Sequence, residues 1–170
     1  MKKMVISIMA VLVLLITVLL YLDRDRAGEM ADSAQNARFV IKSSGAVLNT
    51  LGMNDIRSAG EESFKAVLKT SGKDPVYLNY KGCQLKELLK SKNIDTAGKT
   101  MIVIKAADGF SIAYSIEEVM TDKNIYIAYE EEGELLKSAS EGGRGPYQAI
   151  VVSDQFSNRR CKHAVEADLR

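Results

Sequence analysis

The stretch FKAVLKTSGKDPVYLNYKGCQLKELL, residues 64–89, carries the clearest local pattern in the chain. Apolar and more polar side chains alternate over residues 64–68 and again over residues 76–80, which predicts two strands that each have one buried face. Between them, TSGKDP at 70–75 predicts a tight turn, because glycine tolerates positive φ and proline keeps the preceding residue out of the helical region. The two strands are therefore expected to form a hairpin.

A helix is expected directly after this hairpin. Gly82 interrupts the alternation, so we expect the second strand to end there. Leu85, Leu88 and Leu89 then recur at helical spacing among charged residues, which predicts a short amphipathic helix.

Further strands and short helices are expected on both sides of this stretch. The segment MIVIKAA at 101–107 is mostly apolar, which favours a strand buried on both faces, whereas 162–168 alternates as expected of an edge or surface strand. Ser115 and Glu118 match a capping box. Strands are expected at 39–42, 101–107, 110–114, 125–129, 148–152 and 162–168, and helices at 53–59 and from 116 onward. This order predicts an α+β or mixed α/β fold.

The N-terminal 22 residues are expected to anchor the protein in a membrane. Residues 4–22 contain no charged side chain and are long enough to cross a bilayer as one helix. Lys2 and Lys3 precede the run, which favours a cytoplasmic N-terminus and a domain outside the cytoplasm. No small-x-small cleavage site follows the run, so an uncleaved single-pass anchor is the preferred interpretation, and secretion after signal cleavage is the alternative. A polar tether at 23–36 and one domain at 37–170 complete the predicted organisation.

The charge balance excludes two classes of partner. The chain has 23 basic and 22 acidic side chains, which gives no electrostatic footprint for nucleic acid and no polybasic patch for a lipid surface. His163 is the only histidine and no CxxC motif occurs, which argues against a structural zinc site and a dithiol redox motif.

Several segments resemble one known family. YKGCQLKELL at 80–89 resembles the Y-x-G-x-x-L-x-x-L-L signature of the oxidoreductase molybdopterin-binding domain family, which has the sulfite-oxidase-like fold. The resemblance extends in order over about residues 39–169, through ADGFSIAYSIEEV, AYEEEGELL, GPYQAIVV and NRRCKHAVEADL. It implies a mixed sheet with short helices and, in members that keep the motif, a pterin dithiolene that carries molybdenum and a cysteine thiolate that completes its coordination.

The sequence departs from this family at the metal ligand. LKTSG at 68–72 places Thr70 where the resemblance implies the cysteine, and a hydroxyl does not replace a soft thiolate. Gln148 stands at the position of the family's arginine. Tyr129 keeps the position of the active-site tyrosine, and Lys162 keeps that of the lysine in the closing strand.

The candidate binding residues follow from the resemblance and from a basic segment. Residues 158–163 include two arginines, a lysine and a histidine, which suit a phosphate or another anion, although a solvated surface is the usual role of such a run. Tyr129 also fits simple packing, and the loop GGRGP fits either an anion cradle or a turn. The candidate cofactor-binding residues are Thr70, Ser71, Gly72, Tyr129, Arg144, Arg159 and Lys162.

Three roles are open for the two cysteines. Cys83 and Cys161 are compatible with a disulfide outside the cytoplasm or with plain apolar packing. Cys83 is also a candidate substitute metal ligand, although it follows the second strand of the hairpin instead of the first.

The functional hypothesis is a membrane-anchored extracytoplasmic domain that binds a small anionic ligand, a pterin or a protein partner without catalysis. The alternative is an active molybdenum-cofactor oxidoreductase in which Tyr129 assists the chemistry and Arg159 and Lys162 fix the cofactor. The missing cysteine discriminates between these two hypotheses. A thiolate ligand sets both the coordination geometry and the redox potential of the metal, so its replacement should impair catalysis more than folding.

Overall fold

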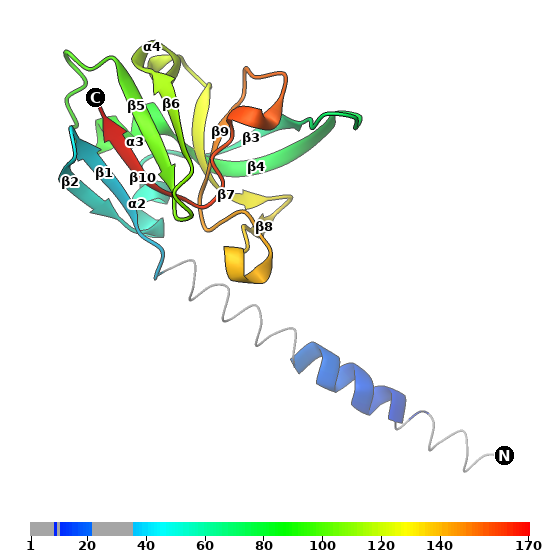
Figure 1. Ribbon diagram of the computed structural model, residues 1–170. Helices are drawn as coiled ribbons and strands as arrows, with labels where there is room; N and C mark the ends of the chain where they lie inside the picture. Colours follow the sequence, from blue (N-terminus) through cyan, green and yellow to red (C-terminus); the bar gives the residue numbers. More distant parts are fainter. Residues whose placement is uncertain (1–8, 10, 22–35) are drawn as a thin grey trace. The chain divides into compact units, whose positions relative to one another are not determined.

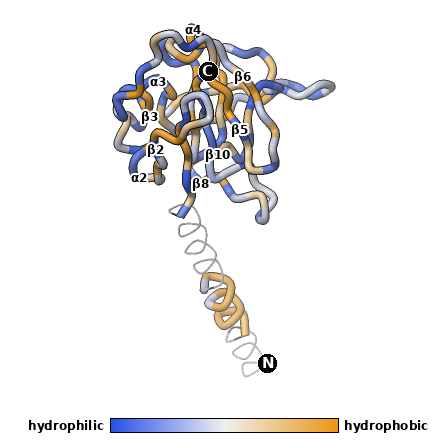
Figure 2. Tube along the Cα trace, turned by 60° about the vertical axis from the view of Figure 1, so that its left-hand side comes forward, coloured by the Kyte–Doolittle hydropathy of each residue, from blue (hydrophilic) through white to orange (hydrophobic). Residues whose placement is uncertain are grey.

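The computed structural model describes residues 9, 11–21 and 36–170, and the chain divides into two units between Asp32 and Ser33. Residues 11–21 are helical, and Figure 2 shows this segment as largely hydrophobic. No helix within the described residues is both long and apolar enough to cross a membrane. The predicted anchor at 1–22 lies in part, and the tether at 23–36 almost wholly, outside the described residues, so both stay predictions.

The second unit contains two five-stranded sheets (Figure 1). In spatial order the first sheet consists of β2 (Ala46–Leu51), β1 (Phe39–Ser43), β10 (Ala164–Leu169), β5 (Met101–Ala106) and β6 (Ser111–Ser115). The second sheet consists of β3 (Glu61–Leu68), β4 (Val76–Gln84), β7 (Ile125–Glu131) and β8 (Glu134–Leu135), with β9 (Gln148–Val151) paired to β7. Only the pair β1 and β10 is parallel among these strands.

Short helices connect the strands. They are α2 (Met53–Ser58), α3 (Leu85–Ser91), α4 (Ile116–Met120) and the 3-10 turns η1 (Ala139–Glu141) and η2 (Ser157–Arg159). The predicted capping box at the start of α4 is confirmed, because the Ser115 hydroxyl accepts from the Glu118 amide and the Glu118 carboxylate accepts from the Ser115 amide. Two sheets with few short helices agree with the predicted mixed α+β class.

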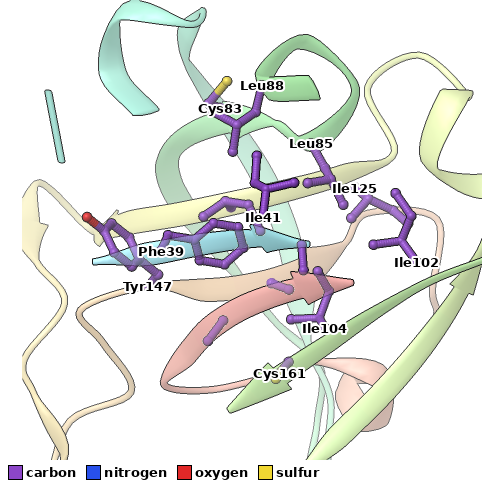
Figure 3. Packing of buried hydrophobic residues seen from close by; sticks show 14 of the residues in the cluster. Phe39, Ile41, Cys83, Leu85, Leu88, Ile102, Ile104, Ile125, Tyr147 and Cys161 are labelled. Atoms are coloured by element: carbon purple, nitrogen blue, oxygen red, sulfur yellow. The ribbon is translucent and has the colours of Figure 1, made fainter. Parts of the chain in front are cut away.

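The main core lies between the two sheets. Phe39 and Ile41 of the first sheet belong to the same buried cluster as Ile127 and Tyr129 of the second (Figure 3 shows part of it). A smaller cluster lies on the other face of the second sheet, where Ala66, Tyr80, Ala128 and Ile150 pack together. Strand β7 contributes to both clusters, and its first five residues are all buried.

The structure corrects the predicted end of the second hairpin strand. β4 does not end at Gly82 but continues to Gln84. A Cβ at Gly82 would lie 2.5 Å from the Ile127 carbonyl oxygen and 2.8 Å from the Ala128 Cα. The glycine is therefore required by the close approach of the β7 backbone, not by the end of a strand.

Three further strands differ from prediction. β5 is buried on one face only, because Met101 and Lys105 are exposed. β10 is not an edge strand but lies between β1 and β5, with Ala167 and Leu169 fully buried. β2 was not predicted, because its outward side chains, including Val47, are largely exposed and give no periodic signal.

Candidate functional site

The hairpin between β3 and β4 holds three of the predicted binding residues, and all three are exposed. Thr70, Ser71 and Gly72 lie in the turn, where the Lys73 amide donates to the Thr70 carbonyl at 3.2 Å. Gly72 has a φ of +75°, and a Cβ at this position would have nothing within 4 Å, so the role of the glycine is conformational. Figure 1 shows the turn between β3 and β4 projecting beyond the other strands of the second sheet. These residues form no enclosed site.

Tyr129 lies in the main core, away from that hairpin. Its ring is fully buried, its hydroxyl donates to the Glu61 carboxylate, and the Arg57 guanidinium lies 5.1 Å from the ring centroid. Burial and the hydrogen bond to Glu61 raise the pKa of Tyr129 well above its ordinary value, so the phenol stays protonated.

The strand β3 separates Tyr129 from Thr70. Glu61, which contacts the tyrosine, is the first residue of β3, and Thr70 lies beyond its last residue, Leu68. At about 3.3 Å per residue, the strand holds the two predicted site residues more than about 20 Å apart. A catalytic site that needs both residues is therefore not formed.

The loop around Arg144 is held by its own backbone. The amides of Gly143 and Gly145 donate to the carbonyls of Ser138 and Lys137 at 2.9 and 2.7 Å. A Cβ at Gly143 would meet the Lys137 carbonyl oxygen at 2.1 Å, so the glycine is needed for close backbone packing. These two amides are therefore already bonded within the loop and are not free to bind an anion.

Both predicted arginines are neutralised by carboxylates. Arg144 donates to Glu131 at 2.9 Å, beside a pocket of about 210 Å³. Arg159 donates to Asp154 at 2.5 and 2.9 Å and to Glu118 at 2.7 Å, and these bonds raise its pKa further. Neither guanidinium offers an unpaired charge to a cofactor.

Arg160, the neighbour of Arg159, is the buried cation of this region. Only 8% of the residue is exposed, and its Nη1 donates to the Tyr80 hydroxyl at 2.8 Å while Nη2 donates to the Val67 carbonyl at 2.6 Å. It takes part in none of the ion pairs within 4.0 Å among the described residues. Burial raises the pKa of Tyr80, against the lowering effect of the Arg160 charge, so the phenol stays neutral at neutral pH.

The segment that carries Arg160 also closes the edge of β3. Ser157 donates to the Lys69 carbonyl from its amide at 3.2 Å and from its hydroxyl at 2.8 Å, and Arg160 reaches the Val67 carbonyl. One carbonyl near the end of the edge strand β3 and one just beyond it are thereby paired. Lys162, two residues further on, is exposed.

Gln148 is a buried side chain without a hydrogen bond. It is fully buried at the start of β9, opposite Ala128 of β7, and neither its amide nitrogen nor its carbonyl oxygen has a partner. Leaving such a group unpaired in the interior costs about 1–3 kcal/mol.

The cysteines lie in the main core. Cys83 and Cys161 are both fully buried free thiols, and Figure 3 shows them on different sides of the cluster, so the disulfide alternative is wrong for this structure. Burial, with nearby carboxylates, raises the pKa of each thiol to about 12. Neither provides a thiolate at the exposed hairpin, so the donor set implied for a molybdenum cofactor does not fit.

The chain is similar to several solved structures. The crystal structure of the sulfane dehydrogenase SoxCD from Paracoccus pantotrophus matches with a TM-score of 0.64 at 16% sequence identity. The match covers 80% of this chain and 38% of that chain. The chain shares the fold of the matched part of this dehydrogenase, which is less than half of that chain.

This likeness supports the sulfite-oxidase-like fold expected from the sequence, and at such low identity it shows the fold alone. No protein-family model matches the chain, and no curated protein matches it. The activity and the ligand must therefore be argued from the residues themselves.

Two buried polar side chains, Arg160 and Gln148, lie outside the predicted set of binding residues. Arg160 was one member of the basic run and was not selected, and Gln148 was noted only as a departure from the family. No local signal predicts the burial of Arg160, because alternation around the buried Cys161 would place both of its basic neighbours on the exposed face.

Proposed function

We propose that residues 37–170 form a non-catalytic, ligand-binding module with a sulfite-oxidase-like fold, held outside the cytoplasm by the N-terminal segment. The proposed absence of catalysis rests on the positions of the two cysteine thiols. Thr70 occupies the exposed hairpin, while both cysteines lie in the core with raised pKa values. A soft metal is left without the thiolate that its coordination needs.

The separation of the other site residues supports the same proposal. Tyr129 is buried against Glu61, more than about 20 Å along β3 from the hairpin turn. Arg144 and Arg159 are already paired with carboxylates. The active-oxidoreductase alternative requires these groups to converge on one cofactor, and no observation favours it.

The experiment is a cofactor analysis of the full-length protein purified from its native host. Molybdenum is measured by mass spectrometry and pterin by the fluorescence of its oxidised form, each per mole of protein. We expect both to be far below stoichiometric. Stoichiometric molybdenum together with pterin would overturn the proposal.

The anchor is tested separately, because the proposal places it on the apolar run at 4–22. The full chain should sediment with membranes, resist extraction by high salt, and expose its domain to protease added from the outer side. A protein released by salt, or protected from that protease, contradicts this placement.

A further inference from the structure

The first sheet carries a pocket at its β2 edge, and none of the predicted binding residues lines it. The pocket has a volume of about 470 Å³ and lies between the β1–β2 hairpin and the loop that follows α3. The hairpin contributes Leu48 and Asn49, and the loop contributes Ile94, Asp95 and Lys99. A volume of this size suits a small molecule, since ligand pockets typically measure about 300–1,000 Å³.

The walls of this pocket are held in place by the fold itself. A bulge in β2 leaves Leu48 without a partner in β1, and such bulges re-aim a side chain. In the loop, Ile94 packs against the main core, and the Asp95 carboxylate accepts from the Ala97 amide at 2.8 Å. An ordered site of this kind loses less conformational freedom when a ligand binds.

Two charges of opposite sign line the pocket without an ion-pair partner. Lys99 donates to the Ser44 hydroxyl at 3.2 Å, and Asp95 uses one carboxylate oxygen for the Ala97 amide. Among the described residues, neither charge forms an ion pair within 4.0 Å, with the other or with any third group. A ligand with one charge would pair with one group and meet the other as a like charge, whereas a ligand with both charges satisfies both.

The rest of the lining combines apolar surface with side-chain amides. Leu48 is 47% exposed, and Ile94 is half-buried. Asn49 and Asn93 make no side-chain hydrogen bond among the described residues, so their amides are available as donors and acceptors. The pocket therefore offers contacts to an aliphatic group beside the two charges.

We propose that this pocket binds a small zwitterion with an aliphatic side chain, which is the chemistry of a free amino acid or a short peptide. Lys99 binds the carboxylate of the ligand, Asp95 binds its ammonium group, and Leu48 and Ile94 contact its aliphatic part. The inference rests on the proposed function, because it gives the binding module a ligand class and a pocket.

The test is a titration of the full-length protein in detergent micelles with L-leucine and with L-leucyl-L-leucine, against sodium chloride. Binding is followed in ¹H–¹⁵N spectra by the side-chain amide signals of Asn49 and Asn93 and by the backbone amide signal of Ala97. We expect a saturable shift with at least one of the two probes. A response to leucine identifies a free amino acid as the ligand, and a response to the dipeptide alone identifies a short peptide.

Derivatives of the responding probe that lack one charge identify the contact that each charge makes. The N-acetylated probe, without the ammonium group, and the C-terminal amide, without the carboxylate, should each bind about tenfold more weakly, the effect of losing roughly 1.4 kcal/mol of interaction. Lys99→Gln should weaken the parent probe about tenfold and leave the amide unchanged. Asp95→Asn should weaken the parent probe about tenfold and leave the N-acetylated probe unchanged.

Two exposed residues of the β5–β6 hairpin provide matched controls. The Asp108 carboxylate accepts from the Phe110 amide at 3.0 Å, as Asp95 does from Ala97, and Lys105 is exposed. Asp108→Asn and Lys105→Gln remove the same charges outside the pocket, so each should change the affinity less than about threefold.

Two results overturn the inference in protein shown to be free of molybdenum. One is the absence of a saturable shift with both probes. The other is a probe whose N-acetyl and amide derivatives bind as tightly as the zwitterion itself. Stoichiometric molybdenum in the same preparation instead overturns the proposed function, so the two failures are distinguishable.

Discussion

Removing one hydroxyl, in Tyr80→Phe, should destabilise the domain through Arg160. The Tyr80 oxygen accepts from Arg160 Nη1 at 2.8 Å, and the guanidinium is 8% exposed, so water cannot readily replace the lost acceptor. A hydrogen bond to a charged group contributes about 1.5–3 kcal/mol, and the second bond to the Val67 carbonyl remains. We therefore expect a loss of about 2 kcal/mol in the free energy of unfolding, or about 6–8 °C in Tm.

The matched control is Tyr77→Phe in the same strand. Tyr77 is 72% exposed, so the same chemical change should cost less than about 0.5 kcal/mol. Urea unfolding followed by far-UV circular dichroism measures both variants. If the two variants were equally stable, the Arg160–Tyr80 bond would contribute nothing and the description of this face would be wrong. A double-mutant cycle with Arg160→Met should give a coupling energy above about 1 kcal/mol.

Two other substitutions test the packing of β4 against β7 and the hydrogen bonds of the Glu118 carboxylate. Gly82→Ala places a Cβ 2.5 Å from the Ile127 carbonyl oxygen and should lower the free energy of unfolding in urea by about 3 kcal/mol. In the control Gly52→Ala the nearest atom to the new Cβ is 3.6 Å away, so the loss should be less than about 1 kcal/mol. Equal losses in the two variants refute the close approach of β7. In Glu118, hydrogen bonds from Ser115 and Arg159 outweigh burial and lower the pKa of the carboxyl in the folded state. Its contribution is therefore fully present above the unfolded pKa of about 4.3 and is lost as the pH falls through the lowered folded pKa. Glu118→Gln should be less stable than the parent at pH 7, and the difference should shrink as the pH falls below about 4. A difference that does not change with pH contradicts this assignment.

The hairpin and the helix after it were predictable because their signals are local. The alternation from Phe64 to Leu68, the turn residues and the leucine spacing of α3 each depend on a few neighbouring positions. The Ser115 capping box was predictable for the same reason. Local pattern thus gave these elements, and the five-segment resemblance supplied the fold that the structural likeness supports.

Position within a sheet was not predictable from the same patterns. β10 alternates like an edge strand, yet its small residues Ala164 and Ala167 fit between β1 and β5. Gly82 has the local character of a strand end, and only the approach of the Ile127 carbonyl explains it. These features depend on which backbones become neighbours, and that information is non-local in the chain.

The pairing of the charged side chains at the candidate site is also not predictable from local sequence patterns. Arg159 and Arg160 are adjacent members of the same basic run, and Arg159 was selected from that run as a candidate binding residue. In the fold, Asp154 and Glu118 neutralise Arg159, while Arg160 turns onto the Tyr80 face with no carboxylate within ion-pair distance among the described residues. The formal charge of each arginine follows from the sequence, but its pairing depends on which carboxylates the fold brings beside it, and that information is non-local in the chain.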